Sequence, residues 1–135
     1  MEPNPPVGCV IVRGGKIVGQ GWHRKFGGPH AEVEALRSAG RRARGAAVCV
    51  TLEPCPHQGK TPPCTQALIR AGVRSVIIGA LDPTPTRMGR GVEALRKAGI
   101  AVQICAATIH EAHDLIAPFA KRAVWGLPWV TAKWA

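Results

Sequence analysis

The feature that most constrains this chain is the segment 28–64, which carries one histidine and two cysteines, each close to a proline. The three residues are His30, Cys55 and Cys64. An imidazole and two thiolates are preferred ligands of Zn²⁺, and three protein ligands leave the fourth tetrahedral position of the ion to water. An open position of this kind is typical of catalytic zinc. The chain is therefore expected to fold so that these three side chains converge.

Glu32 follows His30 by two residues. At this spacing a carboxylate can reach water on the metal without being a ligand, which makes Glu32 the candidate proton carrier. A structural zinc site would be closed by four ligands and would normally use Cys-x₂₋₄-Cys pairs, which this sequence lacks. The pattern favours catalysis. A non-catalytic zinc-binding domain is the alternative, but such a domain would not need a carboxylate at Glu32.

Length and composition indicate one globular domain. The chain has 135 residues, and its hydrophobic content of 46% is enough for a core without disulfides. Aliphatic residues dominate this fraction, while aromatic residues make up only 4%, as expected for an α/β domain. Five cysteines are an odd number without the spacing of a disulfide framework. No run approaches the roughly 20 apolar residues of a membrane span, so we expect a cytoplasmic protein without a membrane segment.

The net charge is +10, which attracts anions such as nucleic acid, a membrane surface or a phosphorylated metabolite. The basic residues are spread along the chain, and the densest group is Arg41, Arg42 and Arg44. There is no basic stripe interleaved with aromatic residues of the kind that binds single strands. We therefore expect a small phosphorylated substrate, met by a few of these basic residues, and no nucleic-acid partner.

Hydrophobic patterns and breaker residues predict alternating strands and helices. The expected strands are 7–12 and 17–21, which form a hairpin, then 46–52, 73–81, 100–105 and an extended run at 127–133; the expected helices are 31–39, 64–71, 92–98 and 109–122. The alternation after residue 46 predicts parallel pairing, and strand 46–52 is expected to be central and buried on both faces. His30 and Cys64 then stand at two helix N-termini that face one another.

The run His30-Ala31-Glu32 resembles the His-x-Glu half of the zinc nucleobase deaminase signature, whose other half is Pro-Cys-x-x-Cys. Here eight residues, 56–63, separate the two cysteines. This longer insert resembles one family in particular, the deaminase domain of the bifunctional riboflavin-biosynthesis deaminase/reductase. The resemblance covers nearly the whole chain and includes, in the same order, the blocks 3–12, 21–23, 30–32, 51–55, 59–64 and 82–83.

This resemblance implies a fold and a domain organisation. The fold expected is a three-layer α/β/α sandwich around a mixed five-stranded sheet, the cytidine-deaminase-like fold. Residues 1–126 would form the deaminase domain, without the helix that family members carry before the Pro-Asn-Pro element, and residues 127–135 resemble the first strand of a truncated reductase domain. The resemblance also implies a homo-oligomer and, in a full-length form, a fused NADPH-dependent reductase domain.

The implied reaction is the zinc-dependent deamination of 2,5-diamino-6-ribosylamino-4(3H)-pyrimidinone 5′-phosphate, an early step of riboflavin biosynthesis. One Zn²⁺ per chain would be held by His30, Cys55 and Cys64, with Glu32 as the catalytic residue. The residues expected to bind substrate are Asn4, His23, His57, Lys60, Thr61, Asp82 and Thr84.

Two of these positions leave questions open. Lys60 is the expected phosphate ligand, with Arg87 and Arg90 as the next candidates. Thr84 stands where the family typically has an asparagine, so a hydrogen bond to the base or ribose is expected to differ. Three other interpretations stay open from the sequence: a nucleoside or tRNA deaminase of the same superfamily, a non-catalytic zinc-binding remnant, and an inactive truncated product.

Overall fold

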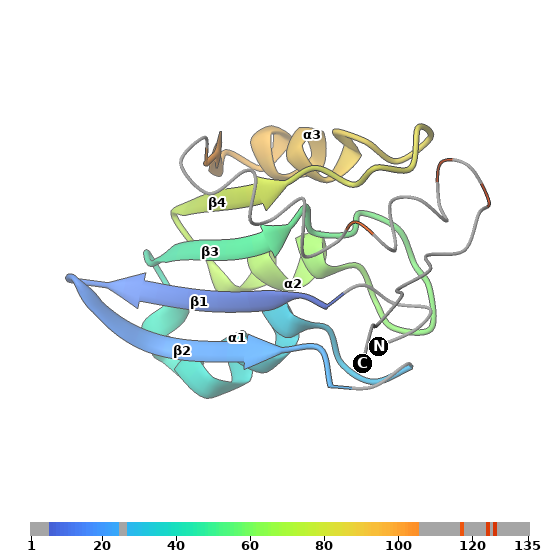
Figure 1. Cartoon of the computed structure of the whole chain (residues 1–135). Helices are drawn as coiled ribbons and strands as arrows, with labels where there is room; N and C mark the ends of the chain where they lie inside the picture. Colours follow the sequence, from blue (N-terminus) through green and yellow to red (C-terminus); the bar gives the residue numbers. More distant parts are fainter. Residues whose placement is uncertain (1–5, 25–26, 106–116, 118–123, 125, 127–135) are drawn as a thin grey trace, which may run out of the picture.

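The computed structural model describes residues 6–24 and 27–105, together with residues 117, 124 and 126. Its elements follow the order expected from the sequence (Figure 1). The strands are β1 (Gly8–Arg13), β2 (Lys16–Trp22), β3 (Ala47–Leu52), β4 (Ser75–Ala80) and β5 (Ala101–Ile104); the helices are α1 (Ala31–Ala39), the 3₁₀ helix η1 (Gly40–Ala43), α2 (Cys64–Ala71) and α3 (Arg90–Lys97).

The five strands form one mixed sheet in the order β2-β1-β3-β4-β5. Strand β1 is antiparallel to both of its neighbours, whereas β3, β4 and β5 run parallel to one another. The predicted hairpin and the predicted parallel half of the sheet are both confirmed. Because the parallel strands end at the same edge, the segments after β3 and β4 meet there, as expected of binding sites in such sheets.

The three α-helices pack on one face of this sheet (Figure 1). Residues paired across the strands, such as Cys9, Val50 and Ile78, are buried and share one core with Leu68 of α2 and Leu95 of α3. The side chains of the opposite face are only partly buried in β1 and β3. The prediction that strand 46–52 is buried on both faces is therefore wrong, because its burial alternates strictly from residue to residue.

Helix α1 lies unusually close to β2, and two glycines make this possible. A Cβ atom on Gly19 would lie 2.5 Å from the carbonyl oxygen of Ala35, and one on Gly21 would lie 2.5 Å from that of Ala31. Real Cβ atoms do not approach so closely, so the strand must carry glycine where the helix crosses it. This close contact fixes the distance between the sheet and the first turn of α1, where His30 and Glu32 lie.

Helix bounds agree with the sequence except at α3. Helices α1 and α2 span the predicted residues, and Gly72 closes α2 with a left-handed φ of 73°. Helix α3 begins at Arg90, two residues before the predicted start, after Gly89 with φ 80°. The sequence gives no sign of this start because the side chain that accepts the N–H groups of the N-cap Gly89 and of Val92 is Glu53, far away in the chain.

Some expected features fall on residues outside the described part. These are the final extended run at 127–133 and the helix at 109–122 apart from Ala117, which is helical. Within the described residues, no helix has the length and apolarity needed to cross a membrane.

Gly19→Ala is expected to destabilise the protein because its new methyl group would overlap the backbone of α1. Overpacking of this kind costs about 1–3 kcal/mol. Denaturant unfolding measures the change, with Gly8→Ala as the matched control, since a Cβ at Gly8 in β1 meets nothing within 4 Å. Equal stability of the two variants would show that α1 does not pack on β2 as described.

Candidate metal and catalytic site

The three predicted ligands come together at the edge where the parallel strands end. His30 is the N-cap of α1, Cys64 is the first residue of α2, and Cys55 follows β3. Nδ1 of His30 lies 3.0 Å from Sγ of Cys64 and 3.6 Å from Sγ of Cys55. The ligand atoms of all three residues lie within 4.8 Å of one another. The expected convergence is therefore present in the structure.

Backbone contacts hold the two cysteines in this arrangement. The N–H of Cys64 donates to Sγ of Cys55 at 3.3 Å, and the N–H of Thr65 donates to the carbonyl of Cys55 at 3.2 Å. Both donors belong to the first turn of α2, where N–H groups have no partner within the helix. The start of α2 thus binds Cys55 directly, and the prolines before Cys64 end the insert where the helix begins.

The donor set fits a tetrahedral zinc ion. Ligand atoms bound at about 2.0–2.3 Å to a tetrahedral Zn²⁺ lie roughly 3.5 Å apart, and Nδ1 of His30 lies 3.0 and 3.6 Å from the two sulfurs. Because Nδ1 of His30 faces both sulfurs, Nε2 is left to carry the proton of the neutral ring. Two thiols and one imidazole also match the soft and borderline ligands that zinc prefers.

Without metal, the three ligands compete for protons. The Cys64 hydrogen bond, followed by that of His30, lowers the pKa of Cys55 to about 4. The pKa of Cys64 is raised, because this thiol donates to the Cys55 thiolate and is buried. The pKa of His30 is raised, first through its hydrogen bond to Cys55. A divalent cation would displace these protons, since thiolate and neutral imidazole are the forms that bind metal.

Glu32 stands on the first turn of α1 beside these ligands. Only 3% of its surface is exposed. Burial raises the pKa of its carboxyl group to about 7, while hydrogen bonds from its own backbone and from Cys64 oppose that shift. A carboxyl group that changes protonation near neutrality can both accept and donate protons. The position next to Cys64 and the burial agree with the predicted role of proton carrier.

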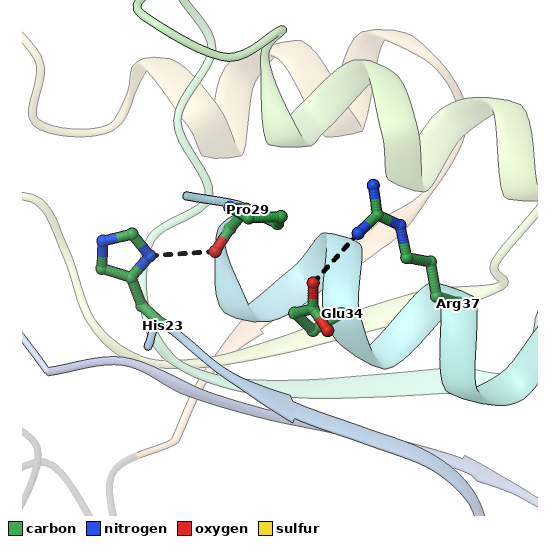
Figure 2. Close-up of polar contacts among 4 residues, drawn as sticks. All are labelled: His23, Pro29, Glu34 and Arg37. Atoms are coloured by element: carbon green, nitrogen blue, oxygen red, sulfur yellow. Dashed lines mark hydrogen bonds and ion pairs between the residues drawn. The ribbon is translucent and has the colours of Figure 1, made fainter. Parts of the chain in front are cut away.

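His23 supports the histidine ligand from the end of β2. Its Nδ1 lies 2.9 Å from the carbonyl oxygen of Pro29 and must be the donor, because a carbonyl only accepts (Figure 2). Its ring meets that of His30 edge to face, with centroids 5.3 Å apart. His23 is buried and also lines the cavity. Figure 2 also shows the ion pair between Glu34 and Arg37 of α1, which lies at least one helical turn after His30.

A cavity opens beside the ligands, and most of the predicted substrate-binding residues line it. These are His23, His57, Lys60, Thr61 and Asp82. Arg87 lines it as well, whereas Arg90 belongs to α3 and is not among the lining residues. Thr84 is not among them either; its N–H donates to Oδ1 of Asp82 at 2.8 Å. Asn4 lies outside the described residues, so its predicted role stays a prediction.

One residue of this region, Glu53, was not predicted from the sequence. Its carboxylate is buried and accepts three backbone hydrogen bonds from the segment after β4. A glutamate directly after an apolar strand, inside a block that resembles a known family, was the only sequence signal. That signal does not distinguish a structural anchor from a residue that faces the substrate.

The fold and the three-ligand site define a zinc-dependent hydrolytic deaminase. Residues 1–80 match the model of the cytidine and deoxycytidylate deaminase zinc-binding region. The chain belongs to this family and, within it, to the diaminohydroxyphosphoribosylaminopyrimidine deaminases, as its similarity to individual proteins shows. The predictions of family and fold class are thereby confirmed, and the predicted ligands form a cluster that could hold the metal of a zinc-binding deaminase domain.

Similarity to two curated relatives and one solved structure supports the assignment of the chain to this family. The chain is 52% identical to the diaminohydroxyphosphoribosylamino-pyrimidine deaminase of Buchnera aphidicola, over 94% of this chain and 86% of the relative. It is 52% identical to riboflavin biosynthesis protein RibD of Aquifex aeolicus, over 99% of this chain but 37% of that protein. The structure of Acinetobacter baumannii RibD superposes with a TM-score of 0.92 at 48% identity, over 96% of this chain and 36% of that one. The chain thus spans little more than a third of the RibD proteins.

Cys55→Ser and Cys64→Ser are each expected to lower zinc content and melting temperature together, because metal binding contributes to the free energy of folding. Elemental analysis of the purified variants measures zinc per chain, and calorimetry measures the melting temperature. Cys49→Ser is the matched control, since Cys49 is a free thiol in β3 outside the metal cluster. Full zinc occupancy in either ligand variant would show that the ligand set is wrong.

Proposed function

We propose that this chain catalyses the hydrolytic deamination of 2,5-diamino-6-ribosylamino-4(3H)-pyrimidinone 5′-phosphate. The products would be 5-amino-6-ribosylamino-2,4(1H,3H)-pyrimidinedione 5′-phosphate and ammonia. The observation that carries the proposal is that the buried Glu32 borders the same cavity as His30 and Cys55, which form the metal cluster together with Cys64. The name of the Buchnera relative, which is 52% identical over 94% of this chain, supports the substrate.

The reaction replaces a carbon–nitrogen bond by a carbon–oxygen bond. Water attacks the ring carbon that bears the amino group, and that group leaves as ammonia. Zn²⁺ held by His30, Cys55 and Cys64 would supply the Lewis acid that lowers the pKa of water. Glu32 takes one proton from the attacking water and transfers it to the ring nitrogen. It then takes the second proton from the new hydroxyl group and gives it to the leaving amine, so that the carbonyl forms and ammonia leaves. Its place beside Cys64, inside the cavity wall, suits both transfers.

The rest of the cavity would orient the phosphorylated substrate. Lys60 and Thr61 of the insert lie on its wall, and Arg87 contributes from the segment after β4. A lysine acts as a point charge on phosphate, whereas an arginine can also form two parallel hydrogen bonds. Lys60 is the proposed phosphate ligand, with Arg87 as the next candidate. Asp82 and His57 supply further polar groups for the ring and the ribose.

The proposal also includes the cellular location and the partners of the enzyme. Free thiol ligands favour a reducing compartment, which supports a cytoplasmic location. A homo-oligomer, and in a longer form a fused NADPH-dependent reductase domain, remain the proposed partners. A nucleoside or tRNA deaminase is the alternative, and it differs from the proposed enzyme only in the substrate that it deaminates.

An ammonia-release assay on the zinc-loaded protein tests the proposal. The phosphorylated diaminopyrimidine is expected to be turned over, while cytidine and tRNA are not. Turnover of tRNA or cytidine alone would replace the proposal by the alternative. Absence of turnover on all three substrates, with zinc bound, would contradict deaminase activity of this chain.

Glu32→Gln is expected to keep zinc and fold but to lose several orders of magnitude in turnover, because the amide cannot carry the proton. Zinc analysis and single-turnover kinetics on the same preparation separate the two effects. Glu34→Gln is the control with near-normal turnover, because Glu34 lies in the same helix but pairs with Arg37 and is not among the residues that line the cavity. A Glu32→Gln variant that works at nearly the normal rate would remove the proposed role.

Lys60→Ala, or removal of the substrate phosphate, is expected to lower kcat/KM about tenfold or more, which corresponds to about 1.4 kcal/mol. Binding energy from the phosphate orients the ring, so both kcat and KM are expected to change. The two changes together should cost little more than either alone, since both remove the same contact. Fully additive losses would show that Lys60 does not meet the phosphate, and Arg87→Ala would then be the next variant to measure.

A further inference from the structure

Glu53 is a buried carboxylate whose partners are all backbone N–H groups. Only 6% of its surface is exposed. Its Oε2 accepts the N–H of Asp82 at 2.9 Å and that of Gly89 at 3.1 Å, and its Oε1 accepts the N–H of Val92 at 3.1 Å. Hydrogen bonds to an ionised acceptor are stronger than those between neutral groups. Leaving such donors unpaired in a buried place would be costly.

The three donors stand at the two ends of one segment. Asp82 begins the segment 82–89 after β4, while Gly89 and Val92 belong to its end and to the first turn of α3. The structure gives α3 no side-chain cap of its own. Glu53 therefore closes the loop and caps the helix from a distant point of the chain. It also stands two residues before Cys55, so the same short stretch carries the metal ligand and the anchor.

A second contact joins the same two parts through the backbone of Pro54. A Cβ atom on Gly91 would overlap the carbonyl oxygen of Pro54, and it would lie 3.0 Å from Cγ and 3.3 Å from Oε1 of Glu53. The first turn of α3 therefore rests directly on the residue before Cys55. Only glycine permits this approach.

The segment 82–89 itself is folded as a compact turn. Oδ1 of Asp82 accepts the N–H of Thr84, and the carbonyl of Thr84 accepts the N–H groups of Arg87 and Met88, both at 2.9 Å. Internal bonds thus set its shape, whereas Glu53 and Gly91 set its place relative to Cys55. Two side chains of the segment, Asp82 and Arg87, line the cavity.

We propose that Glu53 is a positioning residue that holds segment 82–89 against the metal-ligand loop and so determines which substrates the cavity accepts. The proposal rests on the proposed function for the identity of the substrate. Glu53 itself borders the cavity, but its carboxylate oxygens are taken up by backbone N–H groups, so it acts through Asp82 and Arg87. With the anchor in place, these two side chains meet the ribose and phosphate side of a ring held at the metal site. Loss of the Glu53 carboxylate leaves the zinc ligands intact but moves segment 82–89, which forms part of the cavity wall.

Glu53→Gln tests this with little change of shape, because an amide nitrogen cannot accept the N–H groups that the carboxylate accepts. Zinc per chain is expected to stay normal. The kcat/KM for the phosphorylated substrate is expected to fall about tenfold or more, with a rise in KM. The ratio of kcat/KM for the phosphorylated over the dephosphorylated substrate is expected to fall as well. A residue that only stabilises the fold would leave both kcat/KM per zinc and this ratio unchanged.

Amide hydrogen exchange provides a readout that does not depend on activity. In Glu53→Gln, the amides of Asp82, Gly89 and Val92 are expected to exchange faster while those of β3 keep their protection. If the wild-type protein proves inactive on the pyrimidine, this measurement still tests the anchor and separates its failure from that of the proposed function.

Gly91→Ala is the second variant, because its methyl group would overlap the carbonyl oxygen of Pro54 and crowd Glu53, and so would disturb the same contact while keeping the carboxylate itself. It is expected to show normal zinc content and the same loss of preference for the phosphorylated substrate. Gly8→Ala, where an added Cβ meets nothing within 4 Å, is the control with wild-type kinetics. Unchanged substrate preference and unchanged amide exchange in Glu53→Gln would overturn the proposal.

Discussion

The structure depends on one convergence: the carboxyl end of β3 meets the N-termini of α1 and α2. His30 opens the first helix, Cys64 opens the second, and Cys55 lies between them at the strand end. Free N–H groups of α2 bind Cys55 through its sulfur and its carbonyl, so the metal ligands are placed by backbone contacts. The glycines of β2 let α1 approach the sheet closely enough for His30 to reach the sulfurs.

Two buried glutamates near this point have different surroundings and therefore different roles. Glu53 accepts hydrogen bonds from three backbone N–H groups, which make it an anchor. Glu32 lies beside the ligand thiols, where burial raises its pKa to about 7. The fold thus separates a carboxylate that holds the cavity wall from one that can move protons. Both stand within two residues of a metal ligand, so chemistry and wall position are tied to the same short stretches of chain.

The sequence predicted the local parts of this arrangement well, because their signals are local. The ligand residues, the hairpin and the bounds of α1 and α2 follow from motif spacing, glycine stops and apolar runs. Features that depend on distant contacts were not predictable in the same way. The early start of α3 depends on Glu53, and the place of Thr84 outside the cavity lining depends on a turn closed by Asp82. The half-buried outer face of β3 depends on what packs there, which strand composition does not specify.

X-ray absorption spectroscopy at the zinc edge of the purified, zinc-loaded protein tests the central claim most directly. Two thiolates, one imidazole and one open position predict two sulfur scatterers at about 2.3 Å and two nitrogen or oxygen scatterers at about 2.0–2.1 Å. Cys64→Ser should remove one of the two sulfur scatterers. A shell of three or four sulfurs, or a wild-type spectrum that Cys64→Ser leaves unchanged, would contradict the three-ligand catalytic site.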